Sequence, residues 1–161
     1  MRSSFNKMSE ELRLFWKHYV FQSLLATVTV FVVLLLLSIK HAVIIASIGA
    51  TAFIVFAMPK SITAQARNVI GGHTIGIISG SVCALIPHPT IFLTAFIYSF
   101  AVGISIFLMV VLDAEHPPAA GTAMGFAITG FSINAALALG ISVVILSLAH
   151  HLFKSYLRDL T

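Results

Sequence analysis

The segment from Phe21 to Ile39 contains no charged residue and is mostly apolar. Its length matches the roughly 20 residues that a helix needs to cross the 30 Å hydrocarbon core of a bilayer. Hydrophobic residues make up 59% of the chain and charged residues only 9%, whereas soluble domains carry roughly 25% charged residues. These proportions predict an all-α integral membrane protein, and the length allows one compact domain.

Further apolar segments follow the first at residues 42–58, 68–86, 90–112, 117–130 and 134–153. The second is short and the fifth is shorter still. The fifth segment is compatible with a full crossing, with a thin helix buried by its neighbours, or with a segment that dips in and returns. We expect about six transmembrane segments, two of them short or broken, within a domain at 21–153, followed by a tail at 154–161.

Residues 1–20 precede the first span and have an amphipathic pattern. Phe5, Met8 and Leu12 recur at helical spacing with charged residues between them. This pattern predicts an N-terminal helix in the membrane interface. A secretory signal peptide is the competing interpretation, but no small-residue cleavage site follows the apolar run.

Basic residues are distributed unevenly among the loops. With six crossings and a cytoplasmic N-terminus, the outer side holds only Lys40, and the inner side holds Arg2, Lys7, Arg13, Lys17, Lys60, Arg67, Lys154 and Arg158. The positive-inside rule favours this arrangement. We therefore expect a prokaryotic-type cytoplasmic membrane protein with both termini in the cytoplasm. The net charge of +4 then reflects membrane anchoring and does not indicate nucleic-acid binding.

The two halves of the chain resemble each other weakly. Each contains a histidine (His41 or His116), a small-residue stretch with Gly, Ala and Thr, an asparagine (Asn68 or Asn134) and a glycine-bearing span. Three spans per half would place the halves in opposite orientations. We expect two inverted three-helix repeats, at about 21–86 and 90–153, an arrangement in which transporters bind substrate at the repeat interface.

The densest polar cluster is "DAEHPPAAGTAMG" at residues 113–125. Proline at a first helical turn loses no hydrogen bond, so the Pro-Pro pair predicts a helix start just after His116. Ala119, Ala120, Gly121 and Thr122 leave that start nearly bare. The candidate binding residues here are His116, Pro117, Ala120, Gly121 and Thr122. A bare helix N-terminus suits a small anion, but small residues also serve close helix packing, and both interpretations stay open.

The stretch "SIGATA" at residues 47–52 could interrupt the second span in the same way, through Ser47, Gly49, Ala50 and Thr51. Two helix starts would then meet near the bilayer midplane from opposite sides and bind an anion between them.

The stretch "ITAQARNVIGGH" at residues 62–73 adds Arg67, Asn68 and His73 as candidate binding residues. The planar fork of Arg67 suits an oxyanion, although a cytoplasmic anchor or an ion pair with Asp113 or Glu115 explains it equally. An intramembrane histidine such as His73 is a functional candidate by default, and a hydrogen-bonded neutral histidine is the alternative.

Gly72, Gly76 and Gly80 recur at every fourth position and predict a helix face buried against protein, within the subunit or in a homo-oligomer. A metal site built from Asp113, Glu115 and His116 would take all its ligands from one tight loop, which rarely closes a site. We predict no metal and no cofactor.

These motifs ("GATA", "ARNVIGGH" and "EHPPAAGTA") resemble the HPP family of integral membrane proteins, named after the His-Pro-Pro at residues 116–118. The resemblance covers the chain from about residue 20 onward. It implies a polytopic membrane protein, and relatives in plastids and cyanobacteria imply nitrite transport. Family descriptions speak of four spans, whereas the apolar segments here number six.

The leading hypothesis is a non-enzymatic transporter or channel for a small monovalent oxyanion, with nitrite as the first choice. The alternatives are a membrane enzyme that uses the polar residues at 113–116, and a scaffold packed by its small residues. The scarcity of intramembrane acids argues against cation transport.

Overall fold

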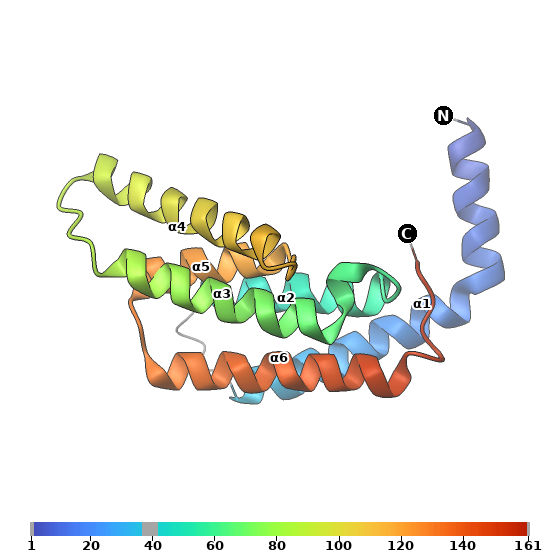
Figure 1. Ribbon diagram of the computed structural model, residues 1–161. Helices are drawn as coiled ribbons and strands as arrows, with labels where there is room; N and C mark the ends of the chain where they lie inside the picture. The colour runs from blue at the N-terminus through green and yellow to red at the C-terminus, as the bar shows by residue number, and fades with distance from the viewer. Residues whose placement is uncertain (1, 37–41, 161) are drawn as a thin grey trace.

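The computed structural model describes residues 2–36 and 42–160, and within them the chain is helical with no strand (Figure 1). The predicted all-α class is therefore confirmed. Lys40 and His41, used above for the charge asymmetry and the repeat, lie outside the described residues. The elements are α1 (Arg2–Leu36), α2 (Ala42–Ala57), the 3₁₀ turn η1 (Ile62–Ala64), α3 (Ala66–Ala84), α4 (Ile91–Val111), α5 (Pro118–Thr129) and α6 (Ile133–Phe153).

Three helices are long and apolar enough to cross a membrane: α1 from Arg13 to Leu35, α4 and α6. Each exposes large apolar side chains, such as Phe31, Phe107 and Ile141, as expected for surfaces in contact with lipid. The apolar part of α2 is shorter, and α5 has only 12 residues. At 1.5 Å per residue α5 is about 18 Å long. The prediction of two short segments is confirmed.

Helix α1 runs without a break through residue 20, where the sequence suggested a boundary between an interfacial helix and the first span. The ribbon bends on the way, so the N-terminal part leaves the bundle at an angle (Figure 1). Buried Gln22 fixes the rest of α1 to the bundle. Its Nε2 donates to the carbonyl oxygen of Phe56, at 2.5 Å, and to that of Arg158, at 2.7 Å.

The C-terminal tail returns to the end of α2. Leu160 N donates to Ala57 O, Lys60 N donates to Asp159 Oδ1, and His150 Nε2 lies 2.9 Å from Pro59 O. The end of α2, the end of α6 and the tail therefore meet at one end of the bundle. Lys60 and Arg158, two of the predicted cytoplasmic residues, lie at this end.

Helices α3 and α5 run parallel and in very close contact. A Cβ at Gly72 would lie 2.7 Å from His116 Cβ, one at Gly76 would lie 2.5 Å from the carbonyl oxygen of Ala119, and one at Gly80 would overlap the carbonyl oxygen of Ala123. Backbone approach of this kind needs glycine. The predicted burial of the glycine face is confirmed, and its partner is α5 of the same subunit.

Leucine at position 76 is therefore expected to disrupt assembly. Its side chain would meet the α5 backbone, which cannot move aside as a flexible side chain can, and overpacking typically costs about 1–3 kcal/mol or more. Thermal unfolding and gel filtration of the purified protein measure the effect. Gly103→Leu on α4 is the matched control, because nothing lies within 4 Å of a Cβ there. Equal stability of the two variants would contradict the packing argument.

The packed helix pairs form a regular pattern. Helix α3 contacts α4, α5 and α6; α2 contacts α1, α5 and α6; α1 also contacts α6, and α4 also contacts α5. Exchanging α1 with α4, α2 with α5 and α3 with α6 leaves this set of pairs unchanged: α2–α5 and α3–α6 map onto themselves, and the other pairs exchange with one another.

Helix α2 is continuous from Ala42 to Ala57, so the predicted interruption at residues 47–52 is wrong. Small residues alone do not break a helix whose neighbours bury it. Helix α5 begins where expected, with Pro117 as its N-cap and Pro118 in its first turn, and it stops at Gly130, whose φ is 75°. Helix α6 then runs back toward the end where the tail packs. Helix α5 is therefore a single helix that runs in one direction, and it is not a segment that dips in and returns.

Candidate functional site

Helix α2 crosses α5 in antiparallel fashion, and a cluster of polar side chains is buried at this crossing, with α3 alongside. The cluster consists of Ser47 and Thr51 from α2, His73 from α3, His116 from the loop before α5, and Thr122 from α5. All five are buried, and the side chains of Thr51, His116 and Thr122 have no exposed surface. Buried polar groups are costly unless they are hydrogen-bonded, so their partners define the cluster.

The five side chains form one continuous chain of contacts. His116 Nδ1 lies 2.8 Å from the carbonyl oxygen of Thr63, and His116 Nε2 lies 3.0 Å from Thr51 Oγ1. Thr51 Oγ1 is also 2.9 Å from His73 Nε2. His73 Nδ1 lies 2.8 Å from Thr122 Oγ1, which continues the chain.

These contacts continue through Ser47 of α2 and end at the first residue of α5. Thr122 Oγ1 lies 2.9 Å from Ser47 Oγ, and Ser47 Oγ donates to the carbonyl oxygen of Pro118 at 2.6 Å. A carbonyl oxygen, which can only accept, therefore stands at each end. The two imidazole rings lie with their centroids 5.0 Å apart, and the Thr51 hydroxyl bridges them. We call this set of residues the histidine–hydroxyl chain.

A cavity of about 320 Å³ adjoins this chain. It opens between α4 and α5, and the residues lining it are Ile106, Met109, Val110, Glu115, His116, Pro117 and Ala120. A nitrite-sized anion or a few water molecules would fit this volume. His116, although it has no exposed surface, thus borders this cavity as well as belonging to the histidine–hydroxyl chain.

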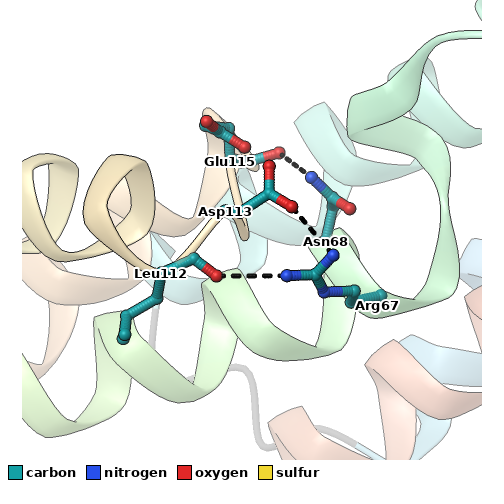
Figure 2. Close-up of polar contacts among 5 residues, drawn as sticks. All are labelled: Arg67, Asn68, Leu112, Asp113 and Glu115. Carbon is teal, nitrogen blue, oxygen red and sulfur yellow. Dashed lines mark hydrogen bonds and ion pairs between the residues drawn. The ribbon is translucent and has the colours of Figure 1, made fainter.

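Arg67 and Asn68, at the start of α3, contact the loop before α5 and not the histidine–hydroxyl chain; Figure 2 shows these loop contacts. Arg67 Nη1 donates to Asp113 Oδ2 at 2.9 Å, and Nη2 donates to the carbonyl oxygen of Leu112 at 3.3 Å. Both charged side chains are about two-thirds exposed, so the ion pair itself contributes only about 0–1 kcal/mol. Of the roles considered for Arg67, the structure shows an ion pair.

Asn68 holds the other side of the same loop. Its Nδ2 donates to the carbonyl oxygen of Glu115 at 3.2 Å, next to His116, as Figure 2 shows. Asp113 has a φ of 52°, a conformation that aspartate tolerates better than most residues. The contacts of Arg67 and Asn68 thus position the loop that delivers His116 to the buried chain.

The predicted helix-start donors are not available. Pro117 and Pro118 have no N–H, Ala119 N donates to His116 O, and Ala120 N donates to Pro117 O. In α2, the residues around Ser47 lie inside a continuous helix. The expected free N–H groups at residues 117–120 and 47–51 are therefore not observed, and anion binding at this crossing stays a prediction with side chains as the donors.

The structure divides the predicted binding residues into groups. Ser47, Thr51, His73, His116 and Thr122 meet in the chain, and Gly121 packs beside them, with a Cβ there 3.5 Å from Ser47 Cβ. Pro117 and Ala120 line the adjoining cavity. Gly49 and Ala50 are exposed on another face of α2, away from the chain.

Sequence reasoning missed two members of the chain, the carbonyl oxygens of Thr63 and Pro118. Backbone acceptors leave no signature in residue type, so no sequence pattern could have identified them. The loop residues Asp113, Glu115 and His116 do not converge, and no group of three metal-binding side chains occurs among the described residues.

A model of the family described as "HPP, transmembrane region" matches residues 11–158. The chain belongs to the HPP family. The His-Pro-Pro motif of this family has two physical roles here: His116 enters the buried chain, and the two prolines start α5.

A transmembrane protein of Dictyostelium discoideum is 39% identical over 108 residues, which cover 62% of this chain and 37% of that protein. The chain thus matches little more than a third of the length of that relative. No solved structure matches the chain.

Proposed function

We propose that this HPP-family protein carries a small monovalent oxyanion, nitrite first, across the membrane. The observation that supports this best is the histidine–hydroxyl chain, buried where two short helices cross inside an apolar bundle. Intramembrane polar clusters are expensive and usually serve a substrate or ion path. Hydroxyl and imidazole groups donate hydrogen bonds to an oxyanion without fixing a permanent charge, which permits release.

The pattern of helix contacts supports an inverted repeat. Exchanging α1–α3 with α4–α6 preserves the packed pairs, and α2 and α5, which would be equivalent, cross in opposite directions at the polar chain. We propose six crossings with both termini in the cytoplasm, where Lys60 and Arg158 would satisfy the positive-inside rule. The polar chain would then lie at the repeat interface, where such transporters bind substrate.

A packing scaffold is the second candidate function. The continuous α2 and the glycine face of α3 sealed against α5 favour it. A scaffold needs only small residues at that crossing, however, and alanine in place of the two histidines would avoid the cost of burying polar rings. Transport explains the histidines, and a scaffold does not.

Uptake of labelled nitrite into proteoliposomes tests the proposal. We expect saturable uptake that exceeds uptake by protein-free liposomes, with nitrate and formate competing more strongly than chloride because they share the planar oxyanion shape. Nitrite flux equal to that of empty liposomes would overturn the proposed transport of this anion. Binding of the same anions to the purified protein would then separate a wrong substrate from a scaffold.

Arg67→Ala is expected to lower the initial rate of nitrite uptake by about tenfold, and Arg67→Lys should recover part of it. Alanine removes both Arg67 contacts to the loop carrying His116, and lysine restores the charge without the planar fork. Initial rates at matched protein content measure the effect. Lys60→Ala is a control that removes a basic side chain elsewhere on the same end of the bundle. Equal losses in Lys60→Ala and Arg67→Ala would show that general surface charge is responsible.

A further inference from the structure

We infer that His73 and His116 together hold one proton more than two neutral imidazoles carry, and that this proton crosses the membrane with the anion. The first statement rests on the buried contacts alone. The second rests on the proposed function.

The proton count comes from the chain of contacts. Between the Thr63 and Pro118 carbonyl oxygens there are six contacts, and each needs one hydrogen. Two neutral imidazoles and three hydroxyls supply five. The carbonyls at both ends cannot donate. One contact in the neutral chain therefore brings two lone pairs together inside the protein.

No other group among the described residues of the protein donates the missing hydrogen to these contacts. Thr51 Oγ1 also lies 2.9 Å from the carbonyl oxygen of Ser47, and this contact is a further demand on the single hydrogen of that hydroxyl. One added proton supplies a hydrogen to each of the six contacts, with the Thr51 hydroxyl turned toward a histidine nitrogen instead of Ser47 O. Each hydroxyl then donates to one neighbour in the chain of contacts, directed away from the charged ring, and that ring is an imidazolium.

The added proton has two equivalent positions. If it resides on His73, both ring nitrogens of His73 donate, and Thr51 donates to His116 Nε2. Transfer breaks the Nε2–H bond of His73 and forms a new O–H bond on Thr51. The former hydroxyl hydrogen of Thr51 then bonds to His116 Nε2. Atoms and charge balance, and the imidazolium moves from α3 to the loop before α5.

Few charges surround this proton. Helices α2, α4 and α5 contain no charged residue. Helix α3 contributes Arg67, which is paired with Asp113. Helix α6 contributes two histidines: His150, which contacts Pro59 O, and His151, which is exposed. The facing acid is Glu115, which lines the same cavity as His116. A proton that enters this cavity from water would therefore pass Glu115 before it reaches His116.

A lone imidazolium inside the bundle lacks a fixed counter-ion among these helices. A monovalent anion bound beside it would neutralise it, so anion and proton favour each other's binding. The transported unit is then one anion plus one proton, with no net charge. Raising the pH removes the proton, breaks one contact in the chain and lowers anion affinity.

Nitrogen NMR of ¹⁵N-histidine-labelled full-length protein in nanodiscs tests the proton count without transport. His73→Gln and His116→Gln spectra assign the two signals. We expect the pair to carry one shared proton at acidic pH and to lose it in a single step as pH rises. Two fully neutral rings from pH 5 to pH 8, or two independent titrations, would overturn the inference.

Proteoliposomes with a pH-sensitive dye inside test the coupling. We expect one proton to enter with each anion, a rate that does not respond to an imposed membrane potential, and at least a tenfold loss in His116→Gln. Nitrate is the second probe, since its acid is too strong to diffuse as a neutral molecule. Anion flux that carries current or moves no proton would overturn coupling and leave the proposed function standing. Absence of any anion flux would instead contradict the proposed function, and the proton count would still be decided by NMR.

Discussion

Gly121→Val is expected to abolish anion uptake while the protein still assembles. A Cβ at this position lies 3.5 Å from Ser47 Cβ, an ordinary contact. The two additional methyl groups of valine would displace the Ser47 side chain, whose hydroxyl bonds Pro118 O and contacts Thr122. The end of the histidine–hydroxyl chain would then open. Initial rates of nitrite uptake measure the loss, which we expect to exceed about a hundredfold.

Two variants make this result specific. Gly121→Ala should retain most of the activity, because the added Cβ fits without a clash. Gly140→Val places valine on α6 where nothing lies within 4 Å of a Cβ, and it should transport normally. Wild-type flux in Gly121→Val, with gel filtration showing intact protein, would remove this crossing from the transport path.

Thr51→Val is the second variant with a large expected effect. Valine has nearly the shape of threonine but lacks the hydroxyl that contacts both His73 Nε2 and His116 Nε2. Leaving a buried polar group without a partner costs about 1–3 kcal/mol. We expect lower thermal stability, loss of proton-coupled uptake and decoupled histidine titrations in the NMR experiment. Thr51→Ser should restore most of the activity, since it keeps the hydroxyl.

Thr74→Val is the matched control for Thr51→Val. The Thr74 hydroxyl bonds the carbonyl oxygen four residues earlier in α3, at 2.8 Å, just as the Thr51 hydroxyl bonds Ser47 O in α2. Thr74 is exposed, and its hydroxyl bonds Ile70 O and neither histidine ring. If both valine variants lose transport equally, the effect comes from the local helix and not from the link between the histidines.

The helical membrane class, the approximate position of the helices and the glycine face could all be predicted from the sequence. These follow from local rules: apolar length, proline at the start of α5 and glycine spacing in α3 are readable without knowing any neighbour. Family membership follows from the same motifs. Polar residues inside apolar segments are conspicuous, so the sequence also identified all five side chains of the histidine–hydroxyl chain as candidates: Ser47, Thr51, His73, His116 and Thr122.

Only the tertiary structure decided how those candidates meet. The stretch around Ser47 could break a helix or continue it, and burial between neighbours decides for a continuous α2. Free N–H groups at the start of α5 were expected, but the loop carbonyls of His116 and Pro117 occupy them. The link from His116 to Thr51 and His73 joins residues 22 to 65 positions apart. Such contacts depend on helix crossing geometry, and residue type and spacing along the chain do not encode it.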